Sequence, residues 1–457
     1  MMKLPRIIFD GLLLLAGLLA PSLAWTDDLL SLYRSALSQD PIYLAARYAL
    51  QASEQKVPQA RADLLPVISL GADTSSQHGS AAFNEAPEED RHVRSNNWSL
   101  RLAQPLFRPA SWSMLSQAEA QYRQAVAQFR LASQDVILRV AQAFFDALLA
   151  QESFSVASAQ LNAVTQQLSL AKRNFQVGTA TITDVHEAQS RLDLARSQQI
   201  AASNELTVKR AELERVAGTP PSMLPMLSSD ASLPRPYPDD VDKWIALAQT
   251  NSPLIAIQDG NKDICEHQLA RSRAGHAPTV DIHASYGSLY SSGSMTSPTD
   301  VPTRSRAGQI GLQVAVPIWS GGAVASRIAE AQANLDKALA DREASRRQAV
   351  TQSRQAFSGI ASGHAQVEAL ASAVLSSQEA VKANQIGYRI GTRINIDVLN
   401  AEQQLYSARR DLARTKMETL MHGLRLKAAT GSLTEQDVIG VNALLDSIDR
   451  RKKEDQS

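Results

Sequence analysis

Residues 175–196, FQVGTATITDVHEAQSRLDLAR, and residues 388–409, YRIGTRINIDVLNAEQQLYSAR, are two copies of one sequence pattern. They align without a gap at an offset of 213 residues, and the same register extends to Gly218 and Gly431. Three matching pairs stand at the start: Gly178 and Gly391, Thr179 and Thr392, Asp184 and Asp397. Prolines repeat farther upstream, where Pro105 matches Pro317. Because a period of about 210 residues far exceeds that of solenoid repeats, each half is expected to be a whole structural unit.

The amino-terminal stretch indicates export. Lys3 and Arg6 precede a short apolar run at 12–19, and Ser22-Leu23-Ala24 is an acceptable cleavage site. Residues 1–24 are therefore predicted to be a signal peptide. No later stretch reaches the roughly 20 apolar residues that a membrane-spanning helix needs. We expect an exported protein without a helical membrane anchor.

The composition argues against several functional classes. Lysine plus arginine and aspartate plus glutamate both number 46, so the net charge is zero and nucleic acid is not an expected partner. The single cysteine, Cys265, lies far from the cleavage site, which leaves no lipid-attachment cysteine there. His186-Glu187 is not followed by a histidine in metalloprotease register, and the sequence has no phosphate loop or nucleophile elbow. We expect no enzymatic activity, no cofactor and no metal site.

Four stretches of the chain alternate between apolar and polar residues, at about 67–76, 96–105, 279–290 and 307–317. A strand of about ten residues with one apolar and one polar face is typical of transmembrane β-strands. Aromatic residues on that face suit the membrane interface. The residues predicted to face lipid are Trp98, Leu100, Leu102, Tyr286, Ile310, Leu312, Val314 and Val316.

Four strands cannot close a barrel, and an open edge in lipid would leave backbone groups without hydrogen bonds. The smallest closed membrane barrels have eight strands. A membrane-spanning arrangement therefore needs strands from several chains, eight from a dimer or twelve from a trimer. The alternative is a periplasmic coiled-coil scaffold or adaptor, in which two ordinary hairpins pack on helices and never enter the membrane.

Long helical runs follow the strands in each half, at about 110–174 and 322–387. At 1.5 Å per residue each is about 100 Å long. Val136, Val140 and Phe144 show the narrow apolar stripe of a coiled coil. Helices of about half this length are expected before the strands and after the long helices, so that two short helices stacked end to end match one long helix. Their ranges are 28–64, 183–217, 240–276 and 395–430.

The expected organisation is a tandem repeat. The first repeat spans 25–218, a proline-rich linker spans 219–240, and the second repeat spans 241–431. The tail at 432–457 matches nothing in the first half, and its charged end, 450–457, is expected to be disordered.

Polar residues cluster where the long helices end: Thr183, Asp184, Tyr388, Arg393, Asp397 and Asn400. Ordinary helix-end chemistry accounts for part of this pattern. A glycine supplies the left-handed residue that ends one helix, and an aspartate favours the positive amino-terminal end of the next. From the residues alone, a structural role and a functional role both remain open.

At these turns the chain resembles the TolC family of outer-membrane efflux and secretion channels. The matching motifs are F-x-V-G-T-x-x-x-x-D-V and Y-x-I-G-T-R-x-x-x-D-V-L, each opening an A-x-x-x-L-x-x-A-R helix, with P-L-F and P-I-W-S-G-G at the strand exits. The resemblance covers nearly the whole mature chain. It implies a mainly helical fold in which three chains share a twelve-stranded transmembrane β-barrel, continuous with a coiled-coil α-helical tunnel through the periplasm.

The resemblance also implies roles for the residues at the turns. Gly178, Thr179, Gly391 and Thr392 correspond to turns that dock a periplasmic adaptor. Thr183, Asp184, Tyr388 and Arg393 correspond to a network that holds the tunnel closed. Asp397 and Asn400 occupy the positions of two acidic rings at the aperture. Because the second is an asparagine here, the resemblance implies a weaker negative constriction, with one ring carboxylate per chain.

The function that the resemblance implies is that of a homotrimeric, passive exit duct in the outer membrane. Its partners would be a periplasmic adaptor protein and an inner-membrane transporter, either an ABC or a proton-driven one, and the system would serve type I protein secretion, drug efflux or both. The missing lipid-attachment cysteine is typical of the non-lipidated members.

Overall fold

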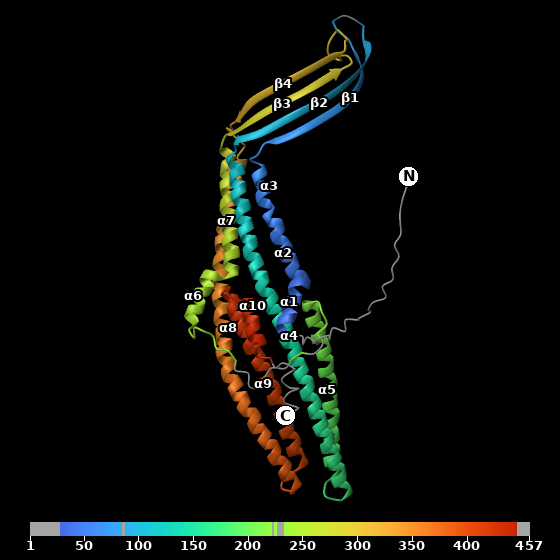
Figure 1. Cartoon of the computed structure of the whole chain (residues 1–457), viewed down its shortest axis with the longest axis vertical. Coiled ribbons are helices and arrows are strands. Elements are labelled where there is room, and N and C mark those ends of the chain that lie inside the picture. The colour runs from blue at the N-terminus through green and yellow to red at the C-terminus, as the bar shows by residue number, and fades with distance from the viewer. Residues whose placement is uncertain (1–27, 85–86, 222–223, 226–232, 446–457) are drawn as a thin grey trace, which may run out of the picture.

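The computed structural model describes residues 28–84, 87–221, 224–225 and 233–445. The predicted signal peptide, part of the linker and the charged end of the tail lie outside the described residues. Figure 1 shows an elongated molecule with one sheet at one end and long helices running away from it. The described residues are mainly helical and contain four strands, as the sequence predicts.

The first half begins with three short helices that lead into the sheet. Asp40 ends the first of these helices and caps the second, and the chain turns into the sheet after Pro66. The elements are α1 (Leu29–Gln39), α2 (Pro41–Glu54), α3 (Lys56–Ala62), β1 (Val67–Ala81), β2 (Glu89–Phe107), α4 (Pro109–Gln176) and α5 (Ile182–Ala217). Both strands are longer than the stretches of alternating sequence that predict them.

The second half repeats this order. Its elements are α6 (Val241–Asn251), α7 (Pro253–Arg273), the 3₁₀ turn η1 (Ala274–His276), β3 (Thr279–Ser291), β4 (Thr303–Ala315), α8 (Ala323–Arg389) and α9 (Asn395–Ala429). A further short helix, α10 (Glu435–Asn442), lies in the tail, where no helix was predicted. Val316, predicted in the fourth strand, lies just beyond the end of β4.

The four strands form one antiparallel sheet in the order β1-β2-β3-β4. The pairing crosses between the halves, because β2 of the first half pairs with β3 of the second. Strands β1 and β4 each pair on one side only, so the sheet has two open edges within one chain.

The short helices stack end to end alongside the long ones. In Figure 1, α2 lies above α5 beside α4, and α7 lies above α9 beside α8. At the upper joint of the first half, Gly218 packs so closely on Gln39 that a Cβ atom would lie 2.2 Å from the Gln39 amide oxygen. At the second joint, a Cβ on Gly431 would lie 2.4 Å from the carbonyl oxygen of Asn251. Both glycines also have a positive φ, which explains why the repeat keeps glycine there.

The main apolar core lies near the middle of the rod, where α1 and α10 pack against α4 and α9. Its largest fully buried side chains include those of Phe144, Phe145 and Leu32. Within the part of the chain that the structure describes, none of the helices is both long and apolar enough to cross a membrane.

Candidate functional site: the strand face and the helical tip

One face of the sheet is apolar across all four strands. The ladder places Leu70 opposite Leu100 and Leu100 opposite Tyr286. Two pairs farther along the same face, Ile282 stands opposite Leu312. Since directly opposed residues project from the same side of a sheet, the predicted lipid-facing strand residues share one face. Ile310 on this face is 80% exposed, and Leu312 and Val314 are also exposed.

The opposite face of the sheet is polar. Arg101 stands between Ser69 and Ser285, and Ser285 stands opposite Gln309. An apolar face backed by a polar one has the pattern of a membrane-facing sheet. Its aromatic residues include Trp98 and Tyr286, whose ring centroids lie 5.8 Å apart.

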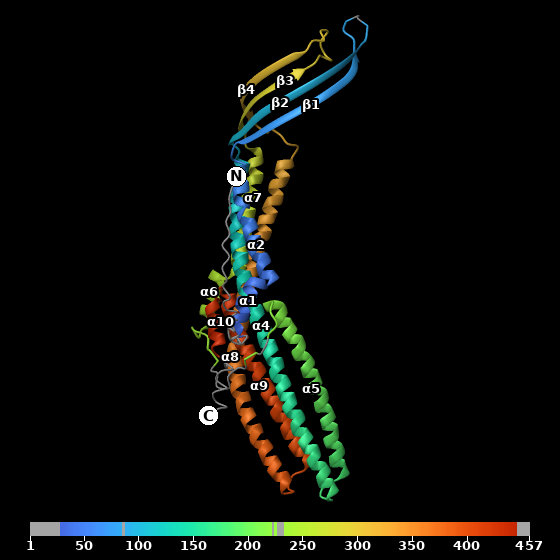
Figure 2. The same cartoon turned by 45° about the vertical axis from the view of Figure 1, so that its right-hand side comes forward.

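The far end of the rod is a tip made of two helix hairpins. The first hairpin is α4 with α5, and the second hairpin is α8 with α9. Figures 1 and 2 show both at the end opposite the sheet, and α9 contacts both α4 and α5. This arrangement brings together sequence segments that are about 210 residues apart in the repeat.

The two tip turns have the same geometry. Gly178 and Gly391 have φ angles of 78° and 79°, with open space where a Cβ would stand. The backbone amides of Thr179 and Thr392 donate back to the carbonyls of Asn174 and Gly387, at 2.8 and 2.9 Å. These bonds satisfy the last carbonyls of the long helices, so the left-handed conformation alone explains the glycines. Both turns leave their residues exposed at the end of the rod.

Asp184 acts as a helix cap in this chain. Its carboxylate accepts hydrogen bonds from the Thr181 amide at 2.9 Å and the Thr181 hydroxyl at 2.8 Å. In return, Thr181 Oγ1 accepts from the Asp184 amide, which completes a capping box at the start of α5. Thr183 lies exposed in the same first turn. Within one chain, Asp184 therefore has the helix-end role that its position after the turn predicts.

Tyr388 and Arg393 make different contacts. The Tyr388 hydroxyl accepts a hydrogen bond from the Asn174 side-chain amide at 3.0 Å, which joins the end of α8 to the end of α4. The Arg393 guanidinium lies 3.7 Å from the Asp397 carboxylate on the first turn of α9. Within one chain the structure thus pairs Arg393 with Asp397 rather than with Asp184.

Asn400 has a partner that the sequence does not reveal. Arg191 of α5 donates to the Asn400 side-chain oxygen at 3.1 Å and to that of Gln403 at 2.9 Å. This is a second link between the two hairpins. From the sequence, an arginine on a helix with polar residues on all sides is expected to face solvent. Only the packing of α5 on α9 shows that Arg191 contacts Asn400.

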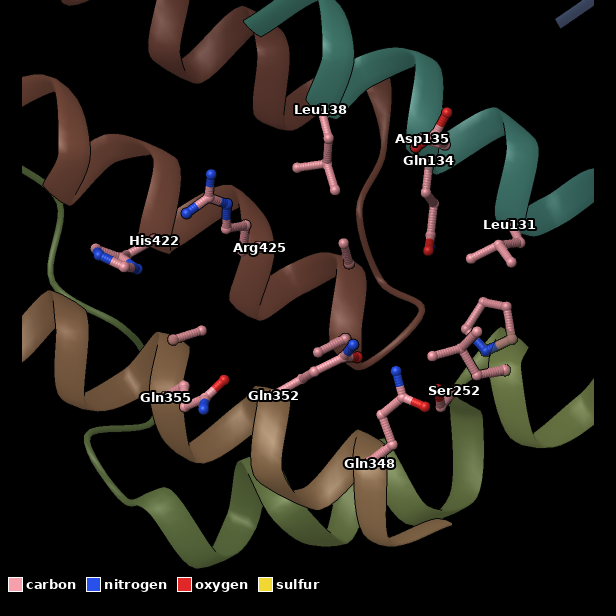
Figure 3. Close-up of a pocket in the computed structure, with 15 residues that line it drawn as sticks. Leu131, Gln134, Asp135, Leu138, Ser252, Gln348, Gln352, Gln355, His422 and Arg425 are labelled. Carbon is pink, nitrogen blue, oxygen red and sulfur yellow. The ribbon is translucent and has the colours of Figure 1, made fainter. Parts of the chain in front are cut away.

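A cavity of about 410 Å³ lies higher up, at the joint where α9 ends and α7 begins. Figure 3 shows Gln134 of α4 pointing into this space opposite Gln348 and Gln352 of α8. Gln134 and Ser252 each carry a buried oxygen without a protein partner. The joint therefore leaves polar groups without protein partners between the packed helices. Among the described residues no cluster has three candidate metal ligands, here or elsewhere.

Comparison with known proteins identifies the fold. The family model for the outer membrane efflux protein matches residues 32–219 and again residues 244–432, which are the two repeats. The chain belongs to the outer membrane efflux protein family. The prediction that the chain resembles TolC-family channels is confirmed.

Members of this family resemble the chain along most of its length. The proteases secretion protein PrtF of Dickeya chrysanthemi is 31% identical over 92% of this chain and 91% of its own. The alkaline protease secretion protein AprF of Pseudomonas aeruginosa is 31% identical over 91% and 86%. The outer membrane protein TolC of Escherichia coli is 29% identical over 93% and 86%.

Solved outer-membrane proteins have the same fold. VceC of Vibrio cholerae superposes with a TM-score of 0.75 at 18% identity, over 88% of this chain and 96% of that structure. The CmeC outer membrane channel of Campylobacter jejuni superposes with a TM-score of 0.76 at 16% identity, over 92% and 90%. At these identities the superposition shows the fold, and it agrees with the predicted fold class.

The family assignment places this protein in the cell outer membrane as an export channel with a periplasmic tunnel. It overturns the alternative of a periplasmic scaffold that stays out of the membrane. The relatives are named as secretion and outer-membrane proteins.

Proposed function

We propose that three copies of this chain form a passive exit duct, with a twelve-stranded barrel in the outer membrane above a tunnel of helices. The observation that carries this proposal is the four-stranded sheet with two open edges and an exposed apolar band on one face. Backbone groups on β1 and β4 need partners in lipid, and a neighbouring copy supplies them when its β1 pairs with β4. Three copies give twelve strands.

The duct is proposed to complete a tripartite export system with a periplasmic adaptor and an inner-membrane transporter. Type I protein secretion is the favoured use, because PrtF and AprF, whose names describe protease secretion, are each 31% identical to this chain. The docking points are the exposed turns at Gly178-Thr179 and Gly391-Thr392.

The tip is proposed to be the gate. Contacts between the hairpins hold it closed, through Asn174 with Tyr388 and through Arg191 with Asn400 and Gln403. Arg393 is exposed and lies one residue beyond the turn, which is a suitable position for reaching Asp184 and Thr183 of a neighbouring copy. Asp397 is proposed to supply the acidic ring.

Oligomeric state and conductance test the architecture together. The protein should need detergent for extraction from outer membranes, should sediment as a trimer, and should form cation-selective channels in planar bilayers. A monodisperse monomer that still conducts would refute the shared barrel. Release into buffer without detergent would contradict a membrane-embedded sheet.

A further inference from the structure

A carboxyl group is buried inside the tip, where the two hairpins meet. Glu402 of α9 is 5% exposed in the single chain, and neighbouring copies in an assembly can only bury it further. Its Oε1 accepts a hydrogen bond from the Gln385 amide of α8 at 3.3 Å, while its Oε2 has no partner. The described residues place no cation in ion-pair contact with it. An ionised carboxylate in such a position is costly.

The groups that face the Glu402 carboxyl from α4 and α8 are uncharged. Gln167 of α4 and Gln385 of α8 present amides. The titratable neighbour on α9 is Tyr406, with Arg409 beyond it. On the exposed side of α9, Arg191 is occupied by Asn400 and Gln403. Burial raises the pKa of Glu402, and the side-chain amides of Gln385 and Gln167 offset this only in part.

The internal repeat offers a comparison. The residue equivalent to Glu402 in the first hairpin is Gln189, which cannot ionise and donates to Asp193 at 3.2 Å. The equivalent helices α5 and α9 therefore differ in whether this position can bind a proton. A second polar residue on the same face of α9, Asn395, is 3% exposed and has neither amide atom partnered. The packing of α9 is thus polar and incompletely satisfied where the gate must move.

We propose that Glu402 is a proton-binding site that keeps the second hairpin packed against α4 while it is protonated and loosens this contact when it ionises. The proposal rests on the proposed gating of the tip. Parting of the hairpins exposes the carboxyl to water, where it ionises at its ordinary pKa. The packed state therefore binds the proton more tightly than the open state.

The direction of the pH dependence follows from this difference. The packed state is favoured at acidic pH, and its advantage is lost as the pH rises from the ordinary glutamate pKa through the raised pKa of Glu402. A single carboxyl changes the ratio of open to closed tips by at most about tenfold per pH unit. Three copies acting together would steepen this dependence.

The test compares the wild type with Glu402→Gln and with Glu379→Gln. Glutamine keeps the shape of residue 402 and is already used at the equivalent position of α5. Glu379 is an exposed carboxylate on α8, so Glu379→Gln is a matched loss of charge. Single-channel opening in planar bilayers, measured from pH 5 to 8, should rise with pH in the wild type and in Glu379→Gln. In Glu402→Gln, opening should stay at the low level of the wild type at acidic pH across the whole range.

Hydrogen exchange gives a second measurement that does not depend on conduction. After correction for the intrinsic pH effect, amides of α9 near Glu402 should lose protection as the pH rises in the wild-type trimer. An unchanged pH profile in Glu402→Gln, or pH-independent protection in the wild type, would overturn the proton site while leaving the channel proposal intact. A protein that never conducts would instead refute the proposed function.

Discussion

At the scale of single residues, Asp40 shows how one side chain joins two elements. It accepts from the Tyr43 amide at 2.9 Å as the cap of α2, and from both terminal nitrogens of Arg139 on α4 at 2.7 and 3.2 Å. Burial alone would raise the pKa of Asp40, yet the bonds from Arg139 and the backbone hold it below its ordinary value. Its charge therefore stabilises the folded chain at neutral pH.

Asp40→Asn should lower the free energy of unfolding by about 3 kcal/mol at pH 7, because it leaves the partly buried Arg139 with half its partners. Asp135→Asn, which removes the more exposed carboxylate beside Arg139, should cost about 1 kcal/mol or less. Urea unfolding in detergent measures both. The cost of Asp40→Asn should shrink as the pH falls through the lowered pKa of Asp40, and equal costs for the two variants at pH 7 would contradict this assignment.

Sequence patterns identify residues whose role depends on local geometry. Gly178 and Gly391 are predictable because a positive φ at a turn follows from the pattern of helix and repeat. Glu402 and Arg191 are not predictable, since a charged residue on a polar helix normally faces water. The packing of α4 and α5 against α9 buries Glu402 and pairs Arg191. This packing depends on contacts between residues some 200 positions apart in sequence.

At the scale of elements, the strand register follows from the alternation, whereas the strand lengths do not. Beyond Thr74, β1 is polar on both faces, so nothing in the sequence marks its end at Ala81; hydrogen bonding to β2 extends it. The helix α10 is missed for a similar reason. It has eight residues and is held by a capping box between Thr434 and Asp437 and by packing of Val438 in the core.

Adjacent residues of β4 test which face meets lipid. Leu312→Arg places a charge on the apolar face and should cost about 2–4 kcal/mol per chain near the middle of the membrane, reducing the yield of assembled trimer in the outer membrane. Gln313→Arg, on the polar face opposite Asp281, should assemble normally. Equal yields of the two variants in membrane fractions would mean that the assignment of faces is wrong.

At the scale of the whole molecule, the proposed gate depends on weak contacts that the proposed trimer repeats by symmetry. The pair of Arg393 with Asp397 is partly exposed and lies within one hairpin, so it contributes about 1 kcal/mol or less and does not itself join the two hairpins. The link from Asn174 to Tyr388 is a single hydrogen bond. In the proposed trimer, three copies of the Asn174–Tyr388 link, together with bonds from Arg393 to a neighbouring copy, would be enough to shift an equilibrium between closed and open tips by a few kcal/mol.

The double variant Arg393→Ser with Tyr388→Phe should therefore increase single-channel conductance without changing the yield of trimer. It also frees the Asp397 carboxylate, so selectivity for cations should rise.

Asp397→Ala should do the reverse, lowering cation selectivity and the block by divalent cations, because it removes the one acidic group assigned to the aperture in each chain. Arg389→Ser, which removes an exposed arginine from the same end of α8, is the control and should behave like the wild type. If the double variant conducts like the wild type while Asp397→Ala alone opens the channel, then Asp397 holds the gate and Arg393 and Tyr388 do not.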